Sequence, residues 1–177
     1  MFQKEANAIA LFPGGFGTHD EGFEILTLAQ TGKSDPQPIV CLQAPGCDYW
    51  NDWAAFITKQ LLERNLINEE DLGLFTIVDS AEEAVAHILK FYSRYHSIRY
   101  VGRQLAMRLQ TSISAEQLER LEQQFGDLLT SGRYELRGPL EEELDEPLLR
   151  NLPRLVFHFN RRSAGRLRQL INHLNNL

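Results

Sequence analysis

The sequence predicts an α/β fold, with a parallel sheet in residues 1–96 followed by a small α+β unit in residues 97–177. In the first part, short apolar runs alternate with helical patterns, which is typical of parallel strands whose faces are covered by helices. After about residue 96 the predicted order of elements changes to strand, helix, strand, strand, helix. This change of pattern is why we expect two units.

Three strands are predicted in the first part, and each is followed by a helix. The strands are expected at residues 9–12, 38–42 and 74–78, and the helices at residues 18–31, 50–64 and 80–92. An open, doubly wound sheet commonly has about five or six strands. Three strands therefore look like half of such a sheet.

The second part contains shorter and more separated elements. Strands are expected over residues 100–109, 134–136 and 155–159, and helices over residues 114–128 and 163–174. The acidic run at residues 141–146 joins the last two strands, and we interpret it as a solvated loop.

Composition narrows the range of functions. Of the 177 residues, 43% are hydrophobic and 24% are charged, the balance of a globular protein with a core. The net charge of −6 argues against nucleic acid and anionic membranes as ligands. Neither a membrane-spanning run nor a signal peptide is visible, and Cys41 and Cys47 lack metal or redox spacing. We therefore expect a cytoplasmic protein with reduced thiols that binds a small molecule or another protein.

The segment that can carry chemistry lies at residues 13–18, between the first strand and the first helix. Its glycines, Gly14, Gly15 and Gly17, allow positive φ angles and close approach of the backbone to an anion. The N–H groups of the first helical turn, aided by the helix dipole, would point at a phosphate. Thr18 can add its hydroxyl group, and Glu21 lies three residues further on.

A structural interpretation of the same residues remains open. Thr18 and Glu21 have the spacing of a capping box, which requires no ligand. Glycines after a strand can also serve only to turn the chain. The residues by themselves therefore support phosphate binding and a purely structural turn about equally.

Residues 13–21, PGGFGTHDE, match the PGGxGTxxE signature of the LONELY GUY family, long labelled lysine decarboxylases. The lead-in at residues 4–8, the helix at 23–32 and the segment at 95–100 also resemble this family. The resemblance extends over nearly the whole chain. The segment at 95–100 and the residues after it resemble a longer bacterial branch of the family. It implies a Rossmann-like fold.

The resemblance also implies an activity, that of a nucleoside 5′-monophosphate phosphoribohydrolase. Such enzymes hydrolyse the N-glycosidic bond and release the free base and ribose 5-phosphate. By this resemblance Gly14, Gly15, Gly17 and Thr18 hold the 5′-phosphate. Glu21 is the catalytic carboxylate that orients or activates water at the ribose. A carboxylate suits this role because it stabilises developing positive charge and can accept a proton.

The sequence departs from the family pattern at its beginning. Members carry a catalytic arginine just before the lead-in, preceded by a glycine-rich half, whereas the sequence here starts at Met1, immediately after the expected place of that arginine. We expect that the chain is a fragment, that its gene starts late, or that another subunit supplies the missing half. Whether the chain alone is an enzyme is left open by the sequence, and a non-catalytic nucleotide- or phosphate-binding module is the alternative.

The remaining expectations concern partners. We expect an AMP-like nucleoside 5′-monophosphate as ligand and a homodimer or higher oligomer, because family members pack helices of this half together. The histidines lack metal-ligand spacing, so no metal is expected. Nothing resembles a pyridoxal phosphate lysine site, so no cofactor is expected either.

Overall fold

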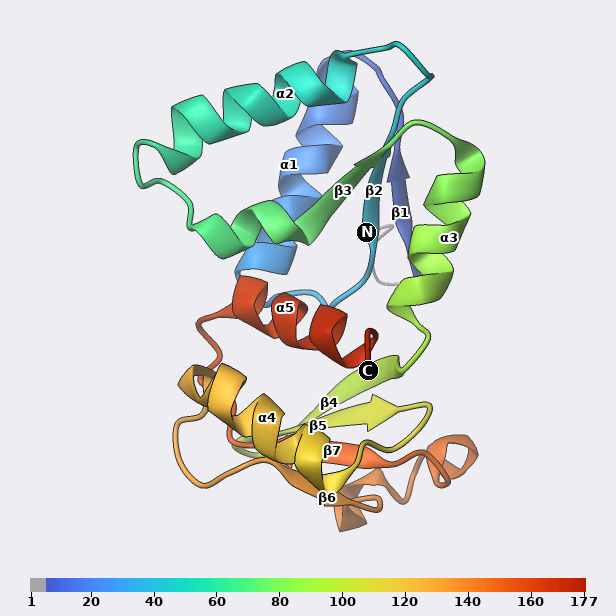
Figure 1. Ribbon diagram of the computed structural model, residues 1–177, viewed down its shortest axis with the longest axis vertical. Helices are drawn as coiled ribbons and strands as arrows, with labels where there is room; N and C mark the ends of the chain where they lie inside the picture. Colours follow the sequence, from blue (N-terminus) through green and yellow to red (C-terminus); the bar gives the residue numbers. More distant parts are fainter. Residues whose placement is uncertain (1–5) are drawn as a thin grey trace. The chain divides into compact units, whose positions relative to one another are not determined.

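The structure is a computed structural model that describes residues 6–177; the first part of the lead-in segment lies outside the described residues. The chain divides into two compact units. The first contains the residues up to Lys90 together with Ala164–Gln169, and the second contains Phe91–Ser163 with Leu170–Leu177. The elements of both units are labelled in Figure 1.

The first unit is built on a three-stranded parallel sheet in the order β1-β2-β3, which confirms the predicted α/β class. Its strands are β1 (Ile9–Leu11), β2 (Ile39–Leu42) and β3 (Phe75–Val78). Its helices are α1 (Phe16–Gln30), α2 (Tyr49–Ile57), a π-helical continuation of α2 (Thr58–Leu62), a 3-10 helix (Glu69–Leu74) and α3 (Ala81–Phe91).

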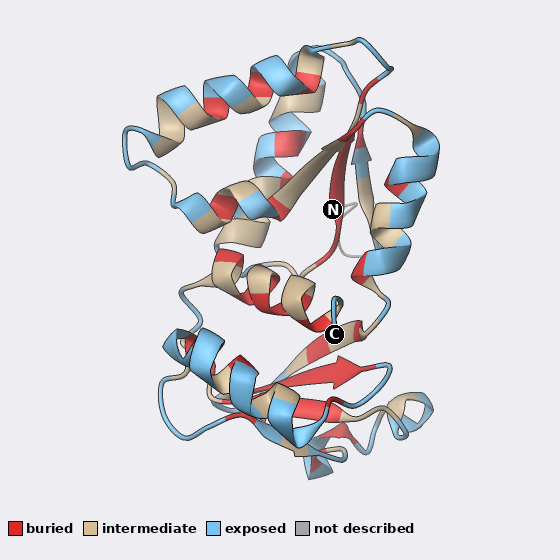
Figure 2. Cartoon of the chain, in the orientation of Figure 1, coloured by how far each residue is buried: buried red, intermediate tan, exposed pale blue. Residues whose placement is uncertain are grey.

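Successive residues of β2 point to opposite faces of the sheet, and both sets are apolar. Helices therefore cover both faces. Ile39 and Cys41 belong to a core that includes the helix α2 tryptophans Trp50 and Trp53. On the other face, Val40 packs in the core to which α3 contributes. The central strand is accordingly buried over its first three residues and half-buried at its end (Figure 2). Burial raises the pKa of the Cys41 thiol to about 12, and both cysteines are free thiols.

The second unit contains a four-stranded antiparallel sheet in the order β4-β5-β7-β6. Its elements are β4 (Tyr95–Val101), β5 (Gln104–Leu109), α4 (Ala115–Phe125), a 3-10 helix (Gly126–Leu128), β6 (Glu135–Arg137), 3-10 helices Glu141–Glu143 and Pro147–Leu149, β7 (Arg154–Phe157) and α5 (Ala164–Leu174). The first six residues of α5 group with the first unit and the rest with the second.

One predicted strand of this unit is in fact a hairpin. The sequence suggested a single strand over residues 100–109, but β4 begins at Tyr95 and turns back into β5 through Gly102, whose φ is +57°. Glycine is favoured in this left-handed region, and a two-residue turn of this kind joins antiparallel strands. The unit therefore has four strands rather than three.

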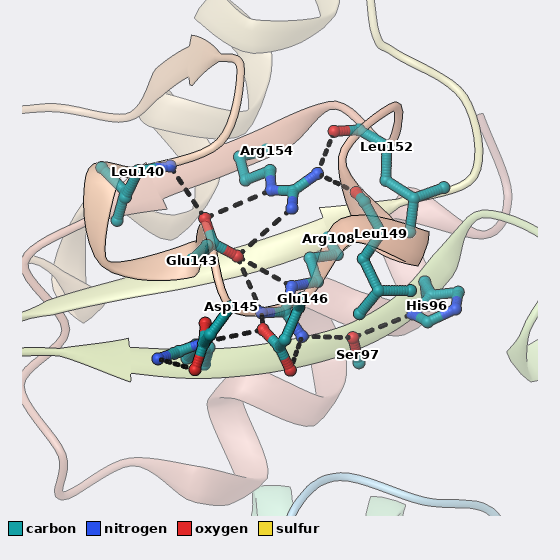
Figure 3. Close-up of polar contacts among 11 residues, drawn as sticks. His96, Ser97, Arg108, Leu140, Glu143, Asp145, Glu146, Leu149, Leu152 and Arg154 are labelled. Atoms are coloured by element: carbon teal, nitrogen blue, oxygen red, sulfur yellow. Dashed lines mark hydrogen bonds and ion pairs between the residues drawn. The ribbon is translucent and has the colours of Figure 1, made fainter.

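The interpretation of residues 141–146 as a solvated loop is wrong for its central carboxylate. Glu143 is only 2% exposed, and its carboxylate accepts hydrogen bonds from Arg108 Nε at 2.8 Å and from the Arg154 guanidinium at 3.3 Å. Arg108 also pairs with Glu146. Arg108, Arg154, Glu143 and Glu146 are called the arginine–glutamate cluster below (Figure 3).

Strand register explains why the acidic segment is drawn onto the sheet. Arg108 of β5 lies directly opposite Arg154 of β7, and both side chains are buried. Like charges at opposed positions of neighbouring strands destabilise a sheet unless they are neutralised. Glu143 supplies that neutralisation, and the N–H of Leu140 also donates to it at 3.0 Å. Charge counting along the sequence misses this, because the partner arginines are distant in the chain.

Candidate anion-binding loop

The loop at residues 12–15 joins the carboxyl end of β1 to the start of α1. Helix α1 begins at Phe16, two residues earlier than predicted, and Gly15 is its N-cap with φ −91° and ψ −153°. No side chain caps this helix, so the predicted capping box between Thr18 and Glu21 is wrong. Thr18 is already the third residue of the helix, too late to serve as the N-cap.

The first backbone hydrogen bonds of α1 show which N–H groups stay open. The N–H groups of Thr18 and His19 both donate to the carbonyl oxygen of Gly15, at 3.1 and 3.3 Å. The N–H groups of Gly15, Phe16 and Gly17 come earlier in the chain and have no carbonyl of the helix to bind. These donors lie at the positive end of the helix dipole, where an anion is favoured.

The three glycines of the loop are not there for positive φ, contrary to the expectation from sequence: none of them adopts it. A Cβ placed on Gly14 would lie 2.1 Å from Thr18 Oγ1, so the Thr18 hydroxyl lies against the bare backbone of Gly14. A Cβ placed on Gly15 or Gly17 would meet no atom within 4 Å. The fold therefore excludes a side chain only at Gly14, and it leaves open space over the other two.

Glu21 lies one turn beyond Gly17 in α1, and it is exposed. Within residues 6–177 its carboxylate has no hydrogen-bond or ion-pair partner. Gly22, the next residue, is buried, and a Cβ placed on it would lie 3.3 Å from a methyl group of Leu11 in β1. This close helix–strand contact fixes the start of α1 beside the end of β1, with Glu21 directed away from the core.

Tyr49, at the start of α2, is a residue of this site that sequence reasoning missed. Its hydroxyl donates to the carbonyl oxygen of Gly14 at 2.5 Å and lies 2.8 Å from Nε2 of His19. The rings of Tyr49 and His19 stack with centroids 5.8 Å apart. The only signal in the sequence is an aromatic residue directly before the second predicted helix, and nothing there indicates a contact 35 residues away.

Among residues 6–177, no group of three or more His, Cys, Asp or Glu side chains is placed to hold a metal ion. No helix in the same range is both long and apolar enough to cross a bilayer.

A parallel strand, a glycine turn and a helix with open first N–H groups are typical of α/β proteins that bind phosphate groups. Comparison with known proteins places the chain more narrowly. Residues 1–88 match the family described as "Possible lysine decarboxylase". Together with the relatives described next, this match shows that the chain belongs to the LONELY GUY family.

The relatives are cytokinin riboside 5′-monophosphate phosphoribohydrolases of Arabidopsis thaliana. LOG1 is 30% identical over 95 residues, which cover 54% of this chain and 43% of LOG1. LOG3 is 31% identical over 88 residues, which cover 50% of this chain and 39% of LOG3. LOG4 is 28% identical over 95 residues, covering 54% and 42%. The chain thus spans about two fifths of the length of these relatives.

Proposed function

We propose that this chain binds the phosphate of a nucleoside 5′-monophosphate and takes part in hydrolysis of its N-glycosidic bond. The 5′-phosphate is held by Gly14, Gly15, Gly17 and Thr18, through the open N–H groups and the threonine hydroxyl. The observation that carries the proposal is the free space over Gly15 and Gly17 at a helix start with no side-chain cap. The names of the relatives support a phosphoribohydrolase rather than a decarboxylase.

Glu21 is proposed as the catalytic carboxylate. In the reaction a water oxygen bonds to C1′ while the C1′–N bond breaks, and its electron pair leaves with the base. Glu21 takes a proton from the attacking water, and its negative charge stabilises the positive charge that develops at the ribose. An exposed carboxylate one turn from the phosphate donors is free to do this, because none of the described side chains engages it.

The test is product release from AMP, CMP, GMP and UMP, with free base and ribose 5-phosphate separated by chromatography. Glu21→Gln should lower release at least about a hundredfold, the loss of a general base. Glu24→Gln is the matched control, because Glu24 is also an exposed glutamate of α1. Equal release by wild type and Glu21→Gln would remove Glu21 from the mechanism.

The second candidate is a non-catalytic module that binds a nucleotide or phosphate through the same loop. The open N–H groups at the start of α1 can bind a phosphate without any chemical step, and they favour this candidate. Calorimetric titration with AMP and ribose 5-phosphate separates the two. Binding without product release supports the module, whereas absence of both would mean that the glycines only turn the chain.

A further inference from the structure

We infer that Tyr49 and His19 are positioning residues that hold the Gly14–Gly15 peptide in the orientation needed for anion binding. The effect on anion binding rests on the proposed function. The contacts themselves involve Tyr49, His19 and Gly14. The Tyr49 hydroxyl lies 2.5 Å from the Gly14 carbonyl oxygen and 2.8 Å from His19 Nε2. Among residues 6–177, this hydroxyl is the side-chain group that hydrogen-bonds to the Gly14–Gly15 peptide.

Proton counting fixes the direction of both hydrogen bonds. A carbonyl oxygen can only accept, so the single hydroxyl proton of Tyr49 goes to Gly14. The hydroxyl oxygen must then accept from His19, which requires a proton on Nε2 of the imidazole ring. The histidine therefore sets the direction of the tyrosine hydroxyl, and the tyrosine sets the direction of the carbonyl.

The carbonyl in turn sets the direction of the next N–H group. The Gly14 carbonyl and the Gly15 N–H belong to one trans peptide plane, in which the two groups point in opposite directions. With its carbonyl held by Tyr49, this peptide directs the Gly15 N–H away from Tyr49, as one of the open donors of the loop. Rotation of the plane would present a carbonyl oxygen in place of that N–H and repel an anion.

Such a rotation needs restraint because the plane lies between two glycines. Glycine has the widest choice of backbone angles, so the chain itself resists the rotation little. The aromatic packing around Tyr49 keeps its hydroxyl in place. The rings of Tyr49 and the buried Trp50 pack edge to face, with their centroids 4.9 Å apart. Helix α2 thereby controls a donor of the loop that precedes α1.

The first experiment compares Tyr49→Phe with wild type, using inorganic phosphate and ribose 5-phosphate as probes. Phenylalanine keeps the ring and its packing and removes only the hydroxyl. We expect affinity for both probes to fall about tenfold, the loss of one hydrogen bond to a charged group. Tyr134→Phe is the matched control, since Tyr134 also donates to a carbonyl, that of Phe125 at 2.7 Å, in the second unit. It should leave both affinities unchanged.

The second measurement does not depend on a ligand. Hydrogen exchange and the NMR signal of the Gly15 amide should change in Tyr49→Phe and stay as in wild type in Tyr134→Phe. His19→Leu should reproduce the Tyr49→Phe effect, and His19→Gln, whose amide keeps a donor at the Nε2 position, should restore much of the wild-type signal. Nitrogen NMR of His19 should show a protonated Nε2.

The outcomes separate this inference from the proposed function. If wild type binds the probes and Tyr49→Phe binds them equally well, the positioning role is wrong and the proposed function stands. If wild type binds neither probe, the proposed function fails, and the Gly15 amide decides the inference alone. An amide unchanged in Tyr49→Phe, or an unprotonated Nε2 on His19, would overturn it.

Discussion

The glycine loop of the first unit and the arginine–glutamate cluster of the second differ in how far their polar groups are hydrogen-bonded within the protein. In the loop, the N–H groups of Gly15 and Gly17 precede the first helical hydrogen bonds, and a Cβ placed on either glycine would meet no atom within 4 Å. In the cluster, Glu143 is buried and bonded by Arg108, Arg154 and a backbone N–H. A ligand can compete for the donors of the loop, whereas those of the cluster are already engaged.

This difference decides whether the loop or the cluster is the better candidate for a functional site. Buried titratable groups with shifted pKa values often mark active sites, but structural ion pairs shift pKa values too. Burial raises the pKa of Glu143, yet the Leu140 N–H and the guanidinium groups of Arg154 and Arg108 outweigh it and hold that pKa below its usual value. Complete internal pairing therefore assigns the cluster to stability, and the open donors assign the loop to binding.

The largest expected effect comes from breaking the cluster. Glu143→Gln removes the negative charge that neutralises Arg108 and Arg154, which lie opposite each other in the sheet. Removing one partner of a buried ion pair costs about 3 to 5 kcal/mol, so the free energy of unfolding should fall by about that much. Urea unfolding followed by circular dichroism measures it.

The matched control is Glu142→Gln, an exposed neighbour in the same acidic run. It should leave the urea midpoint unchanged, as surface substitutions generally do. Phosphate binding at the loop should survive both substitutions under folding conditions. Equal stability of Glu143→Gln and Glu142→Gln would mean that the cluster contributes little, and the contrast between the two regions would fail.

Local patterns in the sequence account for the parts of the fold that were predicted. Apolar runs located all three parallel strands within a residue or so, and the helix expected from residue 114 begins there, with Ser114 and Gln117 forming a capping box. A strand or a cap depends on neighbouring residues, so one sequence is enough to find it. The hairpin at Gly102 was missed because its glycine turn was not recognised between the two runs.

The parts that escaped prediction depend on contacts between distant residues. Glu143 lies 35 residues from Arg108, and Tyr49 lies 35 residues from Gly14. No periodicity within either segment reports such a pairing. The start of α1 was also misplaced, since a threonine is a common cap and here a glycine takes that position. The loop itself was located from its place between a strand and a helix.

A smaller effect is expected from Gly17→Ala, which tests whether the loop binds an anion. Gly17 is helical, and a Cβ there meets no atom within 4 Å, so alanine should raise the free energy of unfolding by up to about 1 kcal/mol. The methyl group would enter the open space beside the first turn of α1, where we propose that the phosphate binds. Phosphate affinity should fall about tenfold, the loss of one charge-assisted hydrogen bond.

Gly73→Ala is the control for this substitution. Gly73 also lies in a helical segment of the first unit with free space at its Cβ position, and it is far from the loop in the chain. It should leave phosphate affinity unchanged. A Gly17→Ala protein that is more stable and binds phosphate as well as wild type would show that the space over the loop is not used by an anion.

The smallest expected effect is a loss of stability in mild acid, caused by one histidine in each unit. Burial lowers the pKa of His87, with Arg168 and Lys90 adding to the shift, and burial lowers that of His96, with Arg108 and Arg154 adding to it. In the unfolded chain a histidine titrates near about 6.5. As the pH falls through that value the unfolded state binds protons first, so the free energy of unfolding should decline.

The cluster should respond at lower pH than the histidines. Because the pKa of folded Glu143 lies below its usual value, its stabilisation is present above about pH 4.3 and is lost only as the pH falls further, towards the folded pKa. Urea unfolding across this range should therefore show two declines. Replacing His87 and His96 together by glutamine should remove the first and keep the second, and Glu143→Gln should do the reverse. A single decline that survives both sets of substitutions would contradict the assignment of acid sensitivity to these groups.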